Sequence, residues 1–279
     1  MISVVLALVG ALGYGIADFV GGVASRRTAA LRIVAVSYPA SVLLVALLVP
    51  VFGGSASVSG LAWGAASGVF AGLAMWWFYR AMAIGPMSIV SPVTAVLVAG
   101  IPVVVGFGLG ERPEVLAIVG ILVAIVAVVM VSREPGHDGE RITSTAAWMA
   151  FGSGSAFGIA FVCMHQIEAG TGLYPLLASR AASTVVVWGA AIAASEFKFP
   201  PRSVLPLALL AGLLEVTATG AIMFALQGSL LSIVSVLGSL YPAATVFLAM
   251  ALLKERLSKV QLVGLAGALA AVGMIAAGA

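Results

Sequence analysis

Long apolar runs alternate with short polar breaks along the whole chain. Ten apolar segments of about 20 residues are separated by breaks that carry charges or Gly, Pro and Ser. They lie at 2–24, 31–50, 60–80, 86–108, 115–132, 145–167, 174–195, 204–227, 229–252 and 260–278. A helix of this length crosses the hydrocarbon core of a bilayer. The pattern therefore predicts an all-α integral membrane protein with ten transmembrane helices and no soluble domain.

The composition excludes a water-soluble protein. Of the 279 residues, 62% are hydrophobic and only 8% are charged, and the mean hydropathy is +1.22. The net charge of +3 is carried by loop residues, which in a membrane protein set orientation and do not indicate nucleic acid. The single cysteine, Cys163, rules out an internal disulfide. The first segment lacks a basic start and contains Asp18, so we expect a retained helix and not a cleaved signal peptide.

Comparing the chain with itself reveals a repeat. A shift of 144 residues carries the sequence Ser-Ile-Val-Ser of 88–91 onto 232–235, and Glu111-Arg112 onto Glu255-Arg256. Over 85–131 and 229–275, 14 of 47 positions are identical without a gap. A shift of 143 carries Tyr14-Gly-Ile-Ala onto Phe157-Gly-Ile-Ala. The shared polar residues count most, because apolar segments match one another easily by chance.

Each copy of the repeat contains five predicted helices. We expect a first repeat at 1–132, a linker at 133–144 and a second repeat at 145–279. Because five is odd, the second copy must enter the bilayer from the opposite side. Inverted repeats of this kind are typical of secondary transporters, which bind substrate between the two halves.

Several motifs resemble the drug/metabolite transporter superfamily, EamA type. They are the Gly-Glu-Arg loop after the fourth helix, Lys-Glu-Arg after the ninth, and the stretch Leu240-Tyr-Pro-Ala-Ala with Gln261-Leu-Val-Gly. The resemblance covers essentially the whole chain and implies the ten-helix fold and a transport function. It does not identify the substrate, since the superfamily spans amino acids, sugars, nucleotides and drugs. The stretch Ala17-Asp18-Phe19-Val20-Gly21 is also similar to the first helix of the small multidrug-resistance relatives. There a membrane carboxylate binds either a proton or a cationic drug, which the resemblance implies for Asp18.

Three charged residues lie well inside predicted helices, away from their ends: Asp18 in the first, Arg180 in the seventh and Glu215 in the eighth. A charge at the helix centre costs about 2.5–3.5 kcal/mol on insertion scales, so each requires a role. They could form structural ion pairs, or the two acids could bind substrate or protons. We favour binding, because Glu215 is central and neither acid recurs in the other repeat. Asp18 corresponds to Phe161, and Glu215 to Ala71.

Other polar and aromatic residues extend the candidate pocket. His165 lies one turn beyond the position equivalent to Asp18, although an interfacial histidine is the simpler interpretation. Trp76 and Tyr79 would either stack on a substrate or anchor their helix at the interface. The residues expected to line the pocket are Tyr14, Trp76, Tyr79, Phe157, His165, Arg180 and Tyr241. Prolines that interrupt helical hydrogen bonding, and are expected to bend their helices, are Pro92, Pro102 and Pro242.

No catalytic or metal-binding motif is present. The sequence contains no Ser-His-Asp set, no histidine pair at ligand spacing and no phosphate-binding Lys loop. We therefore expect no enzyme activity, no cofactor and no metal.

These features predict a secondary transporter of the inner (plasma) membrane that works by alternating access. The favoured chemistry is proton-coupled efflux of a small metabolite or cationic drug, in which desolvated carboxyls exchange a proton for a cation. Glu215 is the better candidate for this exchange, with Asp18 as its partner. The alternatives are uncoupled export of amino acids or similar metabolites, and a non-transporting subunit or scramblase. Expected partners are the substrate, protons and lipid, without nucleic acid, for a monomer or homodimer.

Ten helices place both termini on the same side. The loops after odd-numbered helices hold eleven Lys and Arg residues, and those after even-numbered helices hold only Arg112. Since Lys and Arg favour cytoplasmic loops, the charge count places both termini outside. The family resemblance implies cytoplasmic termini instead. We follow the charge count.

Overall fold

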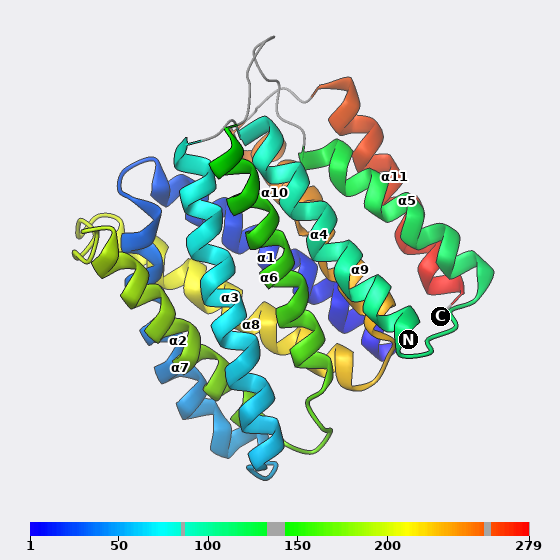
Figure 1. The fold of residues 1–279 in the computed structure, drawn as a ribbon, viewed down its shortest axis with the longest axis horizontal. Coiled ribbons are helices and arrows are strands. Elements are labelled where there is room, and N and C mark those ends of the chain that lie inside the picture. Colours follow the sequence, from blue (N-terminus) through cyan, green and yellow to red (C-terminus); the bar gives the residue numbers. More distant parts are fainter. Residues whose placement is uncertain (85–86, 133–142, 254–257, 279) are drawn as a thin grey trace.

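The computed structural model describes residues 1–84, 87–132, 143–253 and 258–278, and in these ranges every regular element is an α-helix. The helices are α1 (Ile2–Ser25), α2 (Ala30–Phe52), α3 (Val58–Ile84), α4 (Met87–Gly108), α5 (Val115–Ser132), α6 (Ser144–His165), α7 (Tyr174–Ala193), α8 (Leu205–Gln227), α9 (Leu231–Gly238), α10 (Tyr241–Leu253) and α11 (Lys259–Ala277) (Figure 1).

The expected membrane fold is confirmed. Within the described residues, nine spans are long and apolar enough to cross a bilayer, when α9 and α10 are taken together as one span. The remaining helix is α4, whose 22 residues include the apolar stretch Val93–Gly108. The ten spans follow the predicted segments, with the largest end difference at α3, which continues four residues beyond the predicted end to Ile84.

The predicted ninth helix is interrupted. α9 ends at Gly238, Ser239 and Leu240 form a turn, and α10 begins at Tyr241-Pro242. Proline has no N–H and fits the first turn of a helix, so Pro242 stands where the chain restarts. By contrast, α4 runs without interruption through Pro102. Pro92 belongs to the same helix, but its side chain lies outside the described residues.

Helix packing follows the repeat. α1 packs along α8, and α6 packs along α3; since α1 corresponds to α6 and α8 to α3, these two contacts are equivalent. α5 packs against its own counterpart α11, and α4 against α9. Helices of the first half therefore alternate with helices of the second half (Figure 1). The interface between the two halves forms the interior of the protein.

The closest contact between the halves joins α3 and α7. Glycines occur at every fourth position of α3 and face α7: Gly60, Gly64, Gly68 and Gly72. A Cβ atom at Gly68 would overlap the backbone carbonyl of Ser179. Such small residues let two membrane helices approach to backbone contact. They hold α7, and with it the neighbouring Arg180, firmly against the first half.

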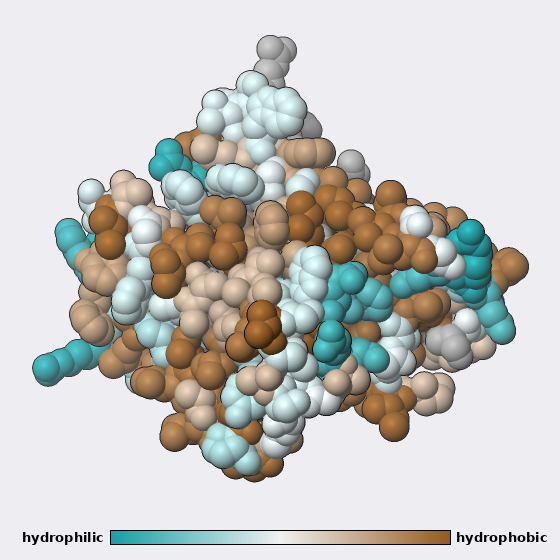
Figure 2. Space-filling model, turned by 60° about the horizontal axis from the view of Figure 1, so that its bottom comes forward, coloured by the Kyte–Doolittle hydropathy of each residue, from teal (hydrophilic) through white to brown (hydrophobic). Residues whose placement is uncertain are grey.

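The outer surface is mostly apolar, as expected for contact with lipid. Figure 2 shows one face on which hydrophobic residues predominate and hydrophilic residues gather in a few groups. Large exposed side chains such as Leu47, Val104, Trp148 and Leu269 belong to four different helices. A water-soluble protein does not expose this much apolar area.

Both termini lie close together at one end of the molecule (Figure 1). The loops after even-numbered spans gather there: Gly228 approaches Ser3, Gly278 approaches Ala117, and Gly54 approaches Gly172. Of the loops that follow odd-numbered spans, the described segments 26–29 and 194–204 consequently lie at the opposite end, and they carry Arg26, Arg27, Lys198 and Arg202.

Candidate functional site

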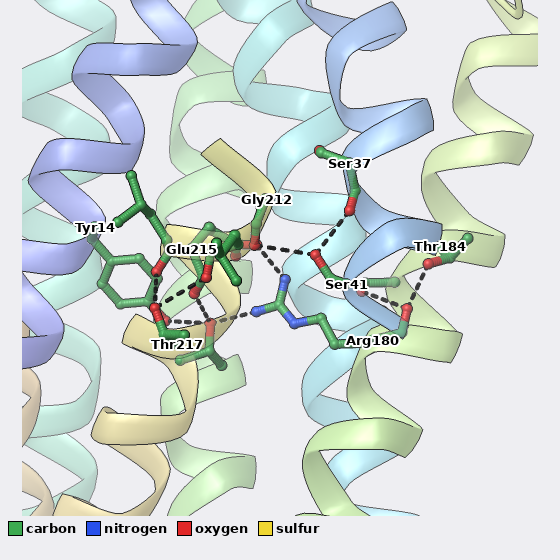
Figure 3. Close-up of polar contacts among 12 residues, drawn as sticks. Tyr14, Ser37, Ser41, Arg180, Thr184, Gly212, Glu215 and Thr217 are labelled. Atoms are coloured by element: carbon green, nitrogen blue, oxygen red, sulfur yellow. Dashed lines mark hydrogen bonds and ion pairs between the residues drawn. The ribbon is translucent and has the colours of Figure 1, made fainter. Parts of the chain in front are cut away.

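A buried ion pair joins α7 to α8 in the interior. Arg180, the seventh residue of α7, is 4% exposed, and its Nη1 donates to the Oε2 atom of Glu215 near the middle of α8. The Glu215 side chain is 22% exposed. Figure 3 shows the guanidinium extending from α7 toward α8, where the carboxylate lies. The cost of burying Arg180 is thus offset by a charge-assisted hydrogen bond.

An aromatic ring covers the face of the same guanidinium. The Cζ atom of Arg180 lies 5.5 Å from the ring centroid of Tyr38, a buried residue of α2. This distance is within the range of a cation–π interaction. The Nε atom of Arg180 is buried and has no hydrogen-bond partner among the described residues. Arg180 is therefore held by contacts from both α2 and α8, while its Nε–H has no partner among the described residues.

Thr219 connects this ion pair to α1. Its hydroxyl accepts hydrogen bonds from Nη2 of Arg180 and from the Tyr14 hydroxyl at 2.9 Å. It donates its own proton to the backbone carbonyl of Glu215, one turn earlier, at 2.8 Å. One donor and two acceptor sites are all that a threonine hydroxyl possesses. All hydrogen-bonding positions of the Thr219 hydroxyl are therefore used, and its oxygen links α1, α7 and α8.

Asp18 lies one turn after Tyr14 on α1 and behaves differently from Glu215. Its side chain is exposed, and it has no hydrogen bond or ion pair within the described part of the chain. It nevertheless interacts electrostatically with Glu215 on α8, Tyr79 on α3 and Tyr241 on α10. These neighbours place the carboxylate beside the ion pair and two tyrosines. Asp18 is thus an exposed acid without a hydrogen bond or ion pair in the described part of the chain.

The broken span lies beside this acid. The Tyr241 and Tyr14 rings meet edge to face with their centroids 6.3 Å apart. The Thr245 hydroxyl of α10 donates to the backbone carbonyl of Gly15 at 3.1 Å, and a Cβ atom at Gly15 would collide with α10. The first turn of α10 therefore packs directly on α1, just before Asp18.

The N-terminus of α9, the first half of the broken span, is already occupied by a carboxylate of the protein. The Glu111 carboxylate, from the loop between α4 and α5, accepts hydrogen bonds from the backbone N–H groups of Leu231 at 2.5 Å and Ser232 at 3.0 Å. In many transporters the N-terminus of a half-helix binds an anionic substrate group. Here Glu111 occupies that position at α9, which is itself buried throughout. This gives the Glu of the Gly-Glu-Arg loop a role in holding the fold.

The structure brings together most of the residues that the sequence singled out. Asp18, Glu215, Arg180, Tyr14, Tyr79 and Tyr241 lie within contact or electrostatic reach of one another. His165 does not join them. Its Nδ1 is 3.2 Å from the carbonyl of Leu226, three turns along α8 from Glu215.

Two of the aromatic residues expected to line the pocket, Phe157 and Trp76, have neighbours other than the residues around Asp18. Phe157 is half-buried and packs against the main hydrophobic core. Trp76 is half-buried, and its Nε1 is buried without a hydrogen-bond partner among the described residues. No contact described for either residue connects it to Asp18.

Sequence reasoning missed Thr219 and Tyr38. Thr219 lies four residues after Glu215 and so on the same face of α8, a spacing that could have indicated a partner. Tyr38 carries no comparable signal. Within the described residues, no group of three or more His, Cys, Asp or Glu could hold a metal ion. The arrangement consists of a neutralised ion pair and one uncompensated acid among tyrosines.

Comparison with known proteins identifies the family. The model of the EamA-like transporter family matches residues 1–133 and again residues 144–277. The chain belongs to the EamA-like transporter family. That family is part of the drug/metabolite transporter superfamily, so the resemblance inferred from the sequence motifs is confirmed and the protein is a membrane transporter of this type.

Solved structures agree on the fold. Twenty-nine chains of known structure match, including one titled only as the crystal structure of a protein. That structure has a TM-score of 0.76 and 13% sequence identity, and the alignment covers 98% of this chain and 95% of the other. At this identity the likeness concerns the fold alone. No curated protein matches the chain.

Proposed function

We propose that this transporter exports a small organic cation in exchange for protons, and that Asp18 is the carboxylate at which the two compete. The observation that carries the proposal is the contrast between the two membrane acids. Glu215 is neutralised by Arg180, whereas Asp18 is exposed and unpaired among the described residues. One negative charge is therefore left in the interior, and either a proton or a monovalent cation can neutralise it.

The surroundings of Asp18 suit a cation with an organic body. Tyr79 and Tyr241 lie within electrostatic reach of the carboxylate, and Tyr14 lies one turn away on the same helix. Tyrosine ring faces attract cations and provide apolar contact area for the rest of a substrate. An inorganic cation would prefer a cage of oxygen ligands, which this side chain alone does not supply.

The ion pair changes the role we assign to Glu215. From the sequence, Glu215 was the better candidate for proton exchange because it lies closer to the centre of its helix. Its pairing with Arg180 instead favours a structural role, since the carboxylate is needed to compensate the charge of a buried guanidinium. In the proposed mechanism Glu215 keeps Arg180 neutralised, so that the guanidinium does not repel the incoming cation. In the uncoupled alternative both acids are paired to Arg180. Our proposal keeps this pairing for Glu215 only.

Transport by the purified protein in proteoliposomes tests the proposal. Ethidium serves as the probe because its fluorescence reports movement of an organic cation. We expect an imposed pH gradient to drive ethidium movement by the wild-type protein and not by Asp18→Asn. Glu168→Gln is the matched control, because Glu168 is an exposed acid of the loop between α6 and α7. This variant should transport like the wild type.

The outcome separates coupling from transport itself. Asp18→Asn should still exchange ethidium for ethidium if cation binding and the alternating-access movement do not require proton transfer. Gradient-driven transport by Asp18→Asn at the wild-type rate would show that Asp18 is not the coupling residue. Transport by the wild type that does not depend on the gradient would favour the uncoupled exporter.

A further inference from the structure

An apolar groove lies between α2 and α7 on the outer surface, away from the site around Asp18. It is lined by Ala35, Val36, Pro39, Trp188, Phe197, Lys198 and Phe199. Its volume of about 150 Å³ is smaller than that of pockets for drug-sized ligands, about 300–1,000 Å³, so the groove holds only part of an elongated ligand. All of the lining residues except Lys198 are apolar or aromatic. The groove therefore fits a hydrocarbon chain with one cation beside it.

The loop that carries Lys198 is held firmly against the end of α7. Ser195 has a φ of 56°, and its N–H donates to the carbonyl of Ile192. The N–H of Glu196 donates to the carbonyl of Ala191 at 2.8 Å. These two bonds form a Schellman motif, which ends the helix and reverses the chain. These bonds fix the direction in which the chain leaves α7 toward the groove.

The one nearby acid is already paired. The Glu196 carboxylate accepts a hydrogen bond from Nε of Arg32 on α2 at 2.6 Å. Lys198 is exposed and has no ion-pair partner within the described ranges. Arg202 follows four residues later in the same loop. The rim that this loop forms beside the groove is therefore positively charged.

We infer that this groove binds an anionic phospholipid, with an acyl chain between α2 and α7 and the phosphate at Lys198. Trp188 fits the position of a membrane interface: its Nε1 donates to the carbonyl of Ala35 at 2.9 Å, while its ring is 39% exposed and meets Phe197 edge to face. Phe199, which also lines the groove, is 84% exposed. Aromatic side chains alternating with basic ones are typical of the headgroup region. Basic pockets between membrane helices bind anionic lipid headgroups.

The occupant is a lipid and not a free phosphate. A soluble anion would find a single charged side chain, Lys198, because the other side chains that line the groove are apolar except for Trp188, whose Nε1 already donates to Ala35. The apolar walls instead provide contact area that only a hydrocarbon chain can use. We expect apolar contact and ionic attraction both to contribute to binding, so the ligand needs an acyl chain and an anionic headgroup.

Native mass spectrometry of the purified protein in detergent tests the site. Phosphatidylglycerol and phosphatidylcholine with identical acyl chains are the two probes, each added in turn. We expect the wild type to retain phosphatidylglycerol more strongly than phosphatidylcholine. Lys198→Gln should weaken the retention of phosphatidylglycerol about five-fold, the effect of one basic residue near an anionic headgroup. Val36→Trp, which fills the groove, should weaken both lipids.

Lys259→Gln is the matched control. Lys259 is an exposed basic residue at the same end of the molecule but on α11, away from the groove. It should retain phosphatidylglycerol as the wild type does. An equal loss in Lys198→Gln and Lys259→Gln would overturn the site, because the attraction would then be due to overall charge. Equal retention of the two lipids by the wild type, or binding of glycerol phosphate alone, would also contradict it.

Discussion

Arg180 is the residue on which the other interior side chains converge. It is paired with Glu215, covered by Tyr38 and hydrogen-bonded to Thr219, so three helices meet at one guanidinium. Burial of an arginine requires such partners, because removing its charge from water is costly. The same arrangement leaves Asp18 as the unpaired acid. Site chemistry and stability therefore depend on the same few side chains.

Arg180→Ala should destabilise the protein by leaving Glu215 without its partner. Breaking a fully buried pair costs about 3–5 kcal/mol, and the 22% exposure of Glu215 reduces the expected loss below that range. Thermal unfolding in detergent measures it, and a second change, Glu215→Gln, should restore part of the loss. Arg32→Ala is the control, because the Arg32–Glu196 pair is about one-third exposed and contributes about 1 kcal/mol or less. Losses from Arg180→Ala and Glu215→Gln that simply add would contradict the pairing.

Thr219→Val should uncouple Tyr14 from Arg180. The substitution keeps the shape of the side chain but removes the acceptor of two donors, at a cost of about 1–3 kcal/mol for each stranded group. Thr219→Ser retains the hydroxyl and should stay near the wild-type melting temperature. Tyr14→Phe should lower the melting temperature in the wild type and have little effect in the Thr219→Val background. An equal effect in both backgrounds would mean that the Tyr14–Thr219 bond contributes nothing.

Sequence reasoning located the charged residues of the site better than their partners. Asp18, Arg180 and Glu215 stand out because a charge inside an apolar segment is rare and costly. Thr219 and Tyr38 are ordinary residues of membrane helices, and they acquire a role only when helix rotation brings them to Arg180. Which acid pairs with Arg180 also depends on that rotation. For this reason the sequence alone favoured Glu215 for proton exchange, whereas the contacts favour Asp18.

At the scale of elements, helix positions follow directly from the apolar segments, but their interruptions do not. The region 229–252 is continuously apolar and was therefore predicted as one helix, although the chain breaks between Gly238 and Tyr241. Pro242 alone could not decide this, since α4 passes through Pro102 without a break. The difference lies in tertiary contacts: Glu111 caps the start of α9, and the start of α10 packs against Gly15.

Gly68→Ala tests the close backbone contact between α3 and α7. The added methyl group would overlap the carbonyl of Ser179, so α7 would have to move away from α3. Gly189→Ala on α7 is the matched control, because a Cβ there meets no atom within 4 Å. It should gain up to about 1 kcal/mol of helix stability. We expect the melting temperature to fall for Gly68→Ala and to stay level or rise for Gly189→Ala; the same change in both would contradict the close contact.

At the scale of the whole molecule, the termini lie at the end opposite to the described basic loops, 26–29 and 194–204. The positive-inside rule therefore predicts that both termini lie outside the cytoplasm, in contrast to the expectation from family resemblance. A C-terminal reporter that fluoresces only in the cytoplasm measures this orientation. We expect it to stay dark, while the same reporter placed in the loop between α7 and α8 should fluoresce. A bright C-terminal reporter would contradict the prediction and place the basic loops outside.

The central claim is that a proton and an organic cation compete for Asp18. Proton release on cation binding measures this competition directly. Tetraphenylphosphonium would be added to the detergent-purified protein in weakly buffered solution, with binding and released protons recorded from acidic to alkaline pH. We predict that the wild type releases close to one proton per bound cation at acidic pH, and that the release vanishes at alkaline pH where the carboxylate is already ionised. Asp18→Asn should release none at any pH. Proton release that persists unchanged in Asp18→Asn, or cation binding by the wild type without release at any pH, would contradict the account.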